Sequence, residues 1–165
     1  MGSGSQPGSS LGLGSGAVPE SGYGSGAGAD SPSPKLHAFE YCALRAVPRV
    51  ERGDLVNVGV IVYCQARDFL QARTHVATDL VLALDPEADL AGIEAAVAAY
   101  ACVCRGGKEA GQAGAITTGQ RFRWLTAPRS TVVQPGPVHL GLTADPAADL
   151  AHLAARLLPR LPSSG

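Results

Sequence analysis

The sequence predicts an α+β domain, in which a largely antiparallel sheet of about five strands carries two helices packed on one face. Three observations predict this class. Segments rich in β-branched and aromatic residues follow one another closely, as in hairpins, before any helix. Two similar helix-start motifs, "DPEADLA" and "DPAADLA", each open an apolar helical pattern. The element order is therefore β-β-β-α-β-β-α, which is typical of helices set apart from an antiparallel sheet.

Residues 1–34 are mostly Gly, Ser and Pro and are predicted to form a flexible, disordered tail. Such a stretch has too little apolar surface to offset the conformational entropy that folding would remove. A translation start assigned too far upstream explains the stretch equally well. The folded part is then a single α+β domain over residues 35–162.

The first half of this domain predicts three strands, over residues 37–47, 55–64 and 69–77, and the polar "PRVERGD" joins the first two. In the second strand, valines form one predicted face: Val56, Val58, Val60 and Val62. The opposite face is also apolar and is interrupted only by Asn57: Leu55, Gly59, Ile61 and Tyr63. A strand that is apolar on both faces is a central strand whose two faces are both covered.

Two helices are predicted from their caps and their apolar spacing. The first covers residues 85–104, with Asp85 as its N-cap and Pro86 as its first residue. The second begins in the same way after Asp145 and ends before the proline of "LLPRL". Its apolar stripe has helical spacing: Leu150, Leu153 and Leu157.

Between the helices, residues 105–120 predict a flexible loop, and two further strands are predicted over residues 121–127 and 130–134. The turn-rich "PGPVHLGLTA" then leads into the last helix. With both helices on one face, the apolar residues on the other face of the sheet need a cover. A dimer partner, a second protein or the "PGPVHLGL" segment could each provide it.

Composition argues against several classes of function. The net charge of −1 and the 16% of charged residues provide no electrostatic basis for general binding to nucleic acid or to membrane surfaces. The sequence contains neither an apolar run of about 18 residues, which a membrane span needs, nor a secretory leader pattern. A cytoplasmic protein is expected, with reduced thiols at its four cysteines: Cys42, Cys64, Cys102 and Cys104.

No pattern predicts a catalytic residue, a metal ion or a cofactor. Cys102 and Cys104 would lie about 200° apart around a helix, so they cannot both ligate one zinc ion. A triad of Ser130, His139 and Asp145 has no support, because the sequence lacks the motif of a nucleophile elbow. The glycine-rich "RGGKEAG" lacks the residue order of a phosphate-binding loop. Most carboxylates are expected helix caps, and the others are scattered.

The segment "RFRWLTAPRS" (121–130) contains three arginines and the only tryptophan of the chain. In a strand, Phe122 and Trp124 would face the core while the arginines between them face solvent. Alternatively, six arginines could grip a phosphate or carboxylate if the strand ends meet: Arg45, Arg49, Arg52, Arg121, Arg123 and Arg129. A buried Arg45 would instead need a structural acidic partner, for which there are three candidates: Glu40, Glu51 and Asp54.

Two long stretches are distinctive as motifs, "FEYCALRAVPRVERGDLVNVGVIVYC" (39–64) and "RFRWLTAPRSTVVQPGPVHLGLTADP" (121–146). Both resemble a bacterial family known as domain of unknown function 3037, and the resemblance covers about residues 37–158. It implies a small cytoplasmic protein, often encoded beside a kinase-like protein of the HipA type, and hence an accessory role. It also implies candidate binding positions: Arg49, Glu51, Arg52, Asn57, Gly59, Arg123, Trp124, Arg129, Ser130, Gln134, Pro135 and His139.

We therefore expect a non-catalytic binding or accessory module. The edge formed by "PRVERGD" and "APRSTVVQPGPVH" would bind a partner protein, such as the HipA-type kinase-like protein, or a small anionic ligand. One alternative is a phosphate-directed hydrolase, in which arginines hold the phosphate, a histidine acts as acid or base, and a carboxylate binds a metal ion: Arg52, Arg129, His139, and Glu51 or Asp54. Another is a structural subunit that forms a homodimer through its uncovered sheet face.

Overall fold

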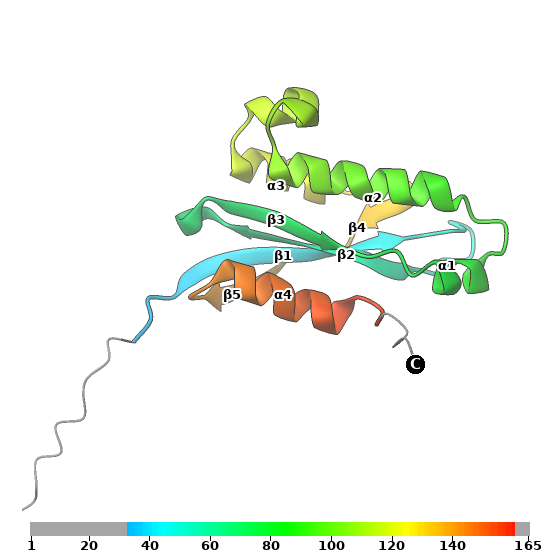
Figure 1. The fold of residues 1–165 in the computed structure, drawn as a ribbon, viewed down its shortest axis with the longest axis horizontal. Helices are drawn as coiled ribbons and strands as arrows, with labels where there is room; N and C mark the ends of the chain where they lie inside the picture. Colours follow the sequence, from blue (N-terminus) through cyan, green and yellow to red (C-terminus); the bar gives the residue numbers. More distant parts are fainter. Residues whose placement is uncertain (1–32, 161–165) are drawn as a thin grey trace, which may run out of the picture. The chain divides into compact units, whose positions relative to one another are not determined.

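The computed structural model describes residues 33–160 and confirms the α+β class, with a five-stranded antiparallel sheet (Figure 1). The predicted tail over residues 1–34 lies outside the described residues except for its last two positions. Residues 161 and 162 of the predicted domain also lie outside them. The domain boundaries therefore stay a prediction.

Five strands form the sheet: β1 (His37–Ala46), β2 (Val56–Cys64), β3 (Phe69–Thr74), β4 (Val133–Pro135) and β5 (His139–Thr143). The first three are the predicted meander, with β2 between β1 and β3. On its other side, β1 pairs antiparallel with β5 along its first half and with β4 at its end. The predicted strand over residues 130–134 is thus confirmed in part, and β5 replaces a predicted turn. The alternation of "HLGLT" fits a strand, but its glycine and the prolines before it favour a turn.

A β-bulge in β2 shifts the alternation of its side chains. Leu44 and Arg45 of β1 pair with Gly59 and Asn57 of β2, so Val58 is the extra residue. Val58 consequently lies in a different core from two other valines of the strand: Val60 and Val62. The predicted all-valine face is therefore wrong at this position, although both faces of β2 are buried as predicted.

Four α-helices and two short 3-10 helices complete the fold: α1 (Thr78–Leu84), α2 (Leu90–Arg105), α3 (Thr118–Thr126), α4 (Pro146–Leu157), η1 (Gln65–Arg67) and η2 (Lys108–Ala115). Within the described residues, no single helix is both long and apolar enough to cross a bilayer. The α4 helix begins as predicted, because the Asp145 carboxylate accepts the backbone N–H groups of Ala147 and Ala148 at 2.9 and 3.2 Å. The predicted loop over residues 105–120 is wrong in part, since it contains η2 and the start of α3.

The start of α2 differs from the prediction. Its N-cap is Asp89, whose Oδ1 accepts the backbone N–H of Gly92 at 2.9 Å, and its first residue is Leu90. Asp85 instead terminates α1, where its backbone N–H donates to the Val81 carbonyl at 2.9 Å. The Asp85 carboxylate instead accepts the Glu87 N–H at 3.2 Å through Oδ1 and pairs with Arg49 Nε at 3.1 Å through Oδ2.

The predicted strand over residues 121–127 is wrong, because this segment forms most of α3. Thr117 and Gln120 make a reciprocal capping box, in which Gln120 Oε1 accepts the Thr117 N–H at 3.1 Å and Thr117 Oγ1 accepts the Gln120 N–H at 3.3 Å. Phe122 and Leu125 are fully buried and lie three residues apart, as on one face of a helix. Trp124 remains 49% exposed.

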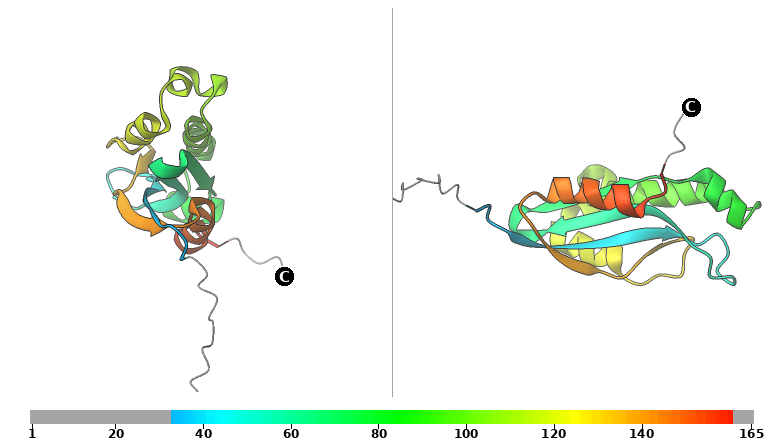
Figure 2. Two further views of the ribbon diagram at one scale, coloured as in Figure 1. Left: turned by 90° about the vertical axis from the view of Figure 1, so that its left-hand side faces the viewer. Right: turned by 90° about the horizontal axis from the view of Figure 1, so that it is seen from below.

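The helices cover both faces of the sheet, which corrects the predicted placement of two helices on one face. In Figure 1, α2 and α3 lie above the sheet and α4 lies below it, and Figure 2 shows the same arrangement from two other sides. The core on the α2 side includes large side chains from both layers: Leu44, Ile61, Ile93, Val97, Phe122 and Leu125. The core on the α4 side is smaller: Phe39, Val60, Val62, Cys64 and Leu150. The cover that the second face requires is therefore α4 itself, packed over β2 and β3.

Candidate functional site

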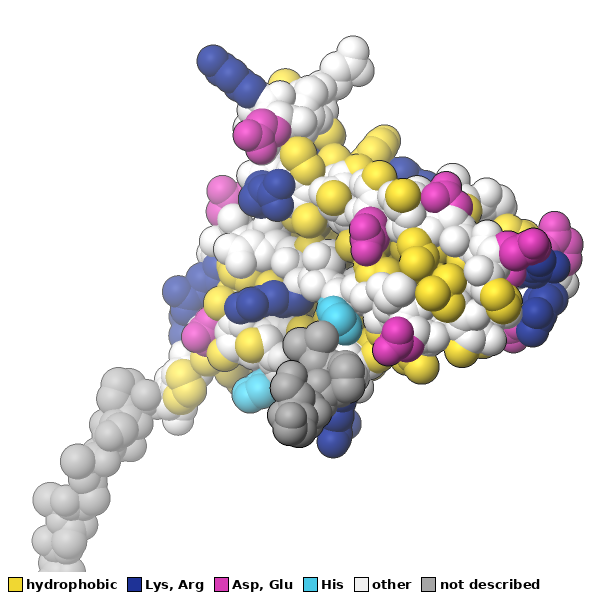
Figure 3. Space-filling model, turned by 45° about the vertical axis from the view of Figure 1, so that its right-hand side comes forward, with side chains coloured by type: hydrophobic (Ala, Val, Ile, Leu, Met, Phe, Trp, Pro, Cys, Tyr) yellow, Lys and Arg dark blue, Asp and Glu magenta, His cyan; other side chains and the backbone are white. Residues whose placement is uncertain are grey.

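The arginines of the β1–β2 loop are held by the turn between α1 and α2. Arg49 Nε lies 3.1 Å from Asp85 Oδ2, and its Nη2 lies 3.4 Å from Glu87 Oε2. Arg52 Nη1 donates to the Leu84 carbonyl at 3.3 Å, and its Nε lies 3.1 Å from Asp54 Oδ2. Figure 3 shows acidic and basic side chains side by side at the end that carries α1. These contacts fix the loop to the helices, while the predicted binding residue Glu51 is exposed beside them.

The hydrogen bond from Arg49 lowers the pKa of Asp85 below its ordinary value of 3.8, although burial opposes this shift. A carboxylate with a lowered folded-state pKa contributes stability above its unfolded pKa and loses it as the pH falls through the folded value. We therefore expect wild type to be more stable than Asp85→Asn above about pH 4, and this difference to shrink at lower pH. Urea midpoints measured from pH 7 to pH 2 test this expectation. The Glu94→Gln variant, at an exposed position of α2, is the control and should show no such convergence.

Arg123 is also engaged in a structural ion pair. Its two terminal nitrogens donate to the two carboxylate oxygens of Glu40 at 2.7 and 2.6 Å, which is a bidentate contact between α3 and β1. Thr118 adds a second tie, because its hydroxyl donates to Asp68 Oδ1 at 2.6 Å. Sequence reasoning places Arg123 on a solvent-facing strand, where it would be free to bind a ligand. In the structure its charge is neutralised by Glu40.

Arg129 lies apart from these ion pairs, at the end of α3. Its guanidinium carbon is 4.1 Å from the centre of the Trp124 ring and 5.8 Å from that of Tyr100. One terminal nitrogen donates to the Trp124 carbonyl, and the neighbouring Ser130 is exposed. A pocket of about 220 Å³ opens beside this stack. The structure thus places Arg129 in the lining of a pocket, and its role in binding stays a prediction. Trp124 is among the motif positions of the sequence, whereas Tyr100 is brought beside Arg129 only by the fold.

Three polar residues form a row across neighbouring strands on the α4 side of the sheet. Arg45 of β1 lies opposite Asn57 of β2 and Gln134 of β4. Asn57 Nδ2 donates to the Leu157 carbonyl at the end of α4 at 2.9 Å. The Nε of Arg45 is buried and has no hydrogen-bond partner among the described residues. None of the three candidate acids forms an ion pair with Arg45, since Glu40 pairs with Arg123, Asp54 pairs with Arg52, and Glu51 is exposed.

The residues required by the hydrolase alternative are not brought together. His139 stacks on Tyr41, with ring centres 5.1 Å apart, on the α4 side of the sheet. Tyr41 is five residues from Ala46, the last residue of β1, which is ~17 Å along a strand. The loop that carries Arg52 lies beyond Ala46, and Arg129 packs against α2 on the other face. General acid–base catalysis needs hydrogen-bond reach, so this arrangement offers no assembled phosphate site.

Cys42 and Cys104 are buried in the core on the α2 side of the sheet. Burial raises the pKa of both Cys42 and Cys104 to about 12, which leaves their thiols protonated and unreactive at neutral pH. In residues 33–160, no three His, Cys, Asp or Glu side chains gather where they could hold a metal ion.

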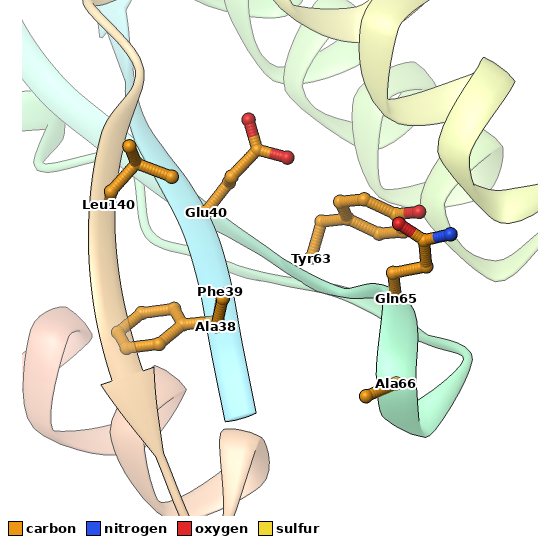
Figure 4. A pocket seen from close by; sticks show the side chains of 7 residues that line it. All are labelled: Ala38, Phe39, Glu40, Tyr63, Gln65, Ala66 and Leu140. Atoms are coloured by element: carbon orange, nitrogen blue, oxygen red, sulfur yellow. The ribbon is translucent and has the colours of Figure 1, made fainter. Parts of the chain in front are cut away.

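The outer strand β5 carries an exposed apolar surface that sequence reasoning misses. Leu140 is 78% exposed and Leu142 is 67% exposed, and both lie on the side of the sheet that faces away from α4. A hollow of about 550 Å³ lies beside them, lined by Leu140 and by residues of β1, β2 and η1: Ala38, Phe39, Glu40, Tyr63, Gln65 and Ala66. Figure 4 shows Leu140 on one side of the hollow and Tyr63 with Gln65 on the other, with the Glu40 carboxylate between them.

Among the described residues, fold and site together define an α+β protein with a sheet covered on both faces, three arginines held in ion pairs, and an uncovered apolar strand edge at β5. The chain belongs to the family described as protein of unknown function DUF3037, whose family model matches residues 41–158. This match confirms the resemblance that the two long motifs indicate. No curated protein and no solved structure matches the chain.

Proposed function

We propose that the protein is a non-catalytic binding module that takes an extended segment of a partner protein as an additional strand against β5. The observation that carries this proposal is the unpaired outer edge of β5 beside two exposed leucines, Leu140 and Leu142. Among the described strands, β5 pairs only with β1, so its other edge presents free backbone N–H and C=O groups. An extended peptide can pair with such an edge, which is how strand addition produces affinity.

The amino-acid composition of β5 leaves its outer edge open to pairing with another chain. Exposed edge strands usually carry charged residues or proline, which prevent other chains from pairing with them. The five residues His139–Thr143 include neither a proline nor a Lys, Arg, Asp or Glu. The opposite edge strand, β3, carries the exposed charge of Arg73. The β5 edge is therefore the better template for a partner strand.

The surroundings of β5 indicate the chemistry of the partner segment. Alternate side chains of an added strand would lie beside Leu140 and Leu142, where apolar side chains bury the most surface. The one carboxylate in the neighbouring hollow, Glu40, is already paired with Arg123, so the hollow favours an apolar side chain over a basic one. The HipA-type kinase-like protein that the family resemblance implies is the first candidate to supply this segment.

The two segments of the predicted edge, "PRVERGD" and "APRSTVVQPGPVH", come close to each other at one point. There the Val47 N–H, just before the first segment, donates to the Val132 carbonyl of the second at 2.8 Å. Arg49 and Arg52 of these segments already form ion pairs within the chain, and Arg129 lines a separate pocket beside α2. The proposal therefore places the partner along β5, at the far end of the second segment.

The proposal is tested by introducing two lysines into β5. We expect the Leu140→Lys/Leu142→Lys variant to weaken binding to the purified HipA-type protein by at least about 100-fold, because both side chains leave an apolar contact and add charge to the edge. Isothermal titration calorimetry measures the affinity. The control is Leu80→Lys, since Leu80 is 47% exposed on α1 and distant from β5 in the fold.

Unchanged affinity in the double-lysine variant would contradict the proposal. Light scattering of the isolated protein identifies the other occupant of the edge. A dimer that the double-lysine variant disrupts and Leu80→Lys leaves intact would show that β5 pairs with a second copy instead.

A further inference from the structure

A second binding site, independent of β5, is indicated by the pocket between α2, α3 and the segment that follows α3. Its lining is mainly apolar and includes Ala99, Tyr100, Val103, Trp124, Arg129 and Val133. Its volume of about 220 Å³ exceeds the ~150 Å³ of a cavity that holds a benzene ring. Binding sites for small molecules are typically apolar pockets with a few convergent polar groups, and this pocket fits that description.

The polar side chains that line the pocket are Tyr100, Arg129 and Thr131, and the Thr131 hydroxyl already donates to the Val133 carbonyl at 2.7 Å. Arg129 donates one hydrogen bond to the Trp124 carbonyl, while a guanidinium has five N–H donors. No carboxylate of the described residues forms an ion pair with Arg129. The Tyr100 hydroxyl is buried and has no hydrogen-bond partner within the same residues. The pocket therefore combines a cation that lacks a counter-ion with an unsatisfied buried hydroxyl.

Stacking on the indole presents the guanidinium in a fixed orientation. Arg129 lies over the face of Trp124, which leaves N–H groups at the edge of the guanidinium for an acceptor. A carboxylate accepts such N–H groups in pairs, and the bond strengthens where water is partly excluded. A compact apolar group joined to that carboxylate would fill the space beside Ala99 and Val103.

We infer that this pocket binds a small organic monoanion, in which a carboxylate meets Arg129 and a group about the size of an aromatic ring occupies the apolar part. The ligand is a free small molecule rather than a polypeptide, because the pocket is limited to this volume and lies against α2, away from the β5 edge. Binding here goes beyond the proposed docking of a partner strand, and its failure would leave that proposal unaffected.

The first experiment uses phenylacetate as the probe, with phenylacetamide as its neutral isostere and acetate as the anion without a ring. Trp124 is the only tryptophan of the chain and lines this pocket and a neighbouring one beside η2, so its fluorescence reports binding at either, and calorimetry provides an independent affinity. We expect phenylacetate to bind saturably with a Kd of about 1 mM, as suits so small a ligand. Phenylacetamide should bind about tenfold more weakly, and acetate should show no saturation.

Two substitutions at adjacent exposed positions of α2 localise the site. Ala99→Leu places a larger side chain in the pocket and should weaken phenylacetate binding at least about tenfold. Ala98→Leu makes the same change one position earlier, at an exposed residue outside the pocket, and should leave the affinity unchanged. Arg129→Gln should abolish the preference for phenylacetate over phenylacetamide, and Arg129→Lys should restore part of it.

The results separate a binding role of Arg129 from a purely structural one at the end of α3. If Arg129 only caps the helix, its substitution lowers the melting temperature but does not alter the preference between the two probes. Equal affinities for phenylacetate and phenylacetamide, full affinity in Ala99→Leu, or no saturable response to phenylacetate would each overturn the inference.

Discussion

The Phe122→Ala variant is expected to lose about 3–5 kcal/mol of unfolding free energy. Phe122 is fully buried in α3, where its ring stacks on Tyr63 of β2 with centres 5.1 Å apart. Removing the ring leaves a cavity between α3 and the sheet, which the surrounding helix can fill only in part. Urea unfolding, followed by far-ultraviolet circular dichroism, measures the loss.

Substitutions at two neighbours of Phe122 distinguish a helix from a strand in this segment. Leu125 is also fully buried, so Leu125→Ala should cost about 2–5 kcal/mol. Trp124→Ala should cost much less, because half of the Trp124 side chain is exposed. In the strand that the sequence predicts, Phe122 and Trp124 share a buried face and Leu125 points away from it. Large losses for Phe122 and Trp124 with a small loss for Leu125 would therefore contradict the helix.

The Leu150→Ala variant is expected to lose about 2–5 kcal/mol, because Leu150 is only 2% exposed and anchors α4 to the sheet. The face on which α4 packs is tested by combining this variant with others. Val62 lies in the same core as Leu150, whereas its neighbour Ile61 lies in the core on the α2 side.

A double-mutant cycle separates the two faces. Leu150→Ala and Val62→Ala should show an interaction energy of about 0.5–3 kcal/mol, since residues in contact are not additive. Leu150→Ala and Ile61→Ala should be additive within about 0.5 kcal/mol. The reverse pattern would place α4 on the same face as α2, as the sequence predicts, and would refute the observed arrangement of layers.

The strands and helices that sequence reasoning predicts correctly are those with strong local signals. β2 is recognisable from its run of β-branched residues, and α4 from the cap at Asp145 followed by a proline. α3 is mistaken for a strand because Phe122 and Trp124 alternate as they would in one. The signal that identifies the helix is the capping box formed by Thr117 and Gln120, just before the segment.

The candidate sites are less predictable than the elements, because their geometry depends on partners distant in sequence. The type of residue marks Arg49, Arg52 and Arg123 as ligand-binding candidates. Arg49 instead pairs with a carboxylate 36 positions away, and Arg123 pairs with one 83 positions away. Arg129 is recognised as a candidate from its turn, but the pocket beside it needs Tyr100 of α2. The exposed edge of β5 is missed, since a strand's exposure depends on what pairs with it.

The sequence by itself determines the α+β class, the β1–β2–β3 meander, the capped start of α4 and membership in the DUF3037 family. These features follow from interactions between residues close together in the chain, or from motifs that are read directly. Tertiary structure alone decides that α4 covers the second face, that Arg49, Arg52 and Arg123 form ion pairs within the chain, and that Leu140 and Leu142 stay uncovered. The physical reason is that burial and ion pairing depend on distances between residues far apart in sequence, which local propensities do not contain.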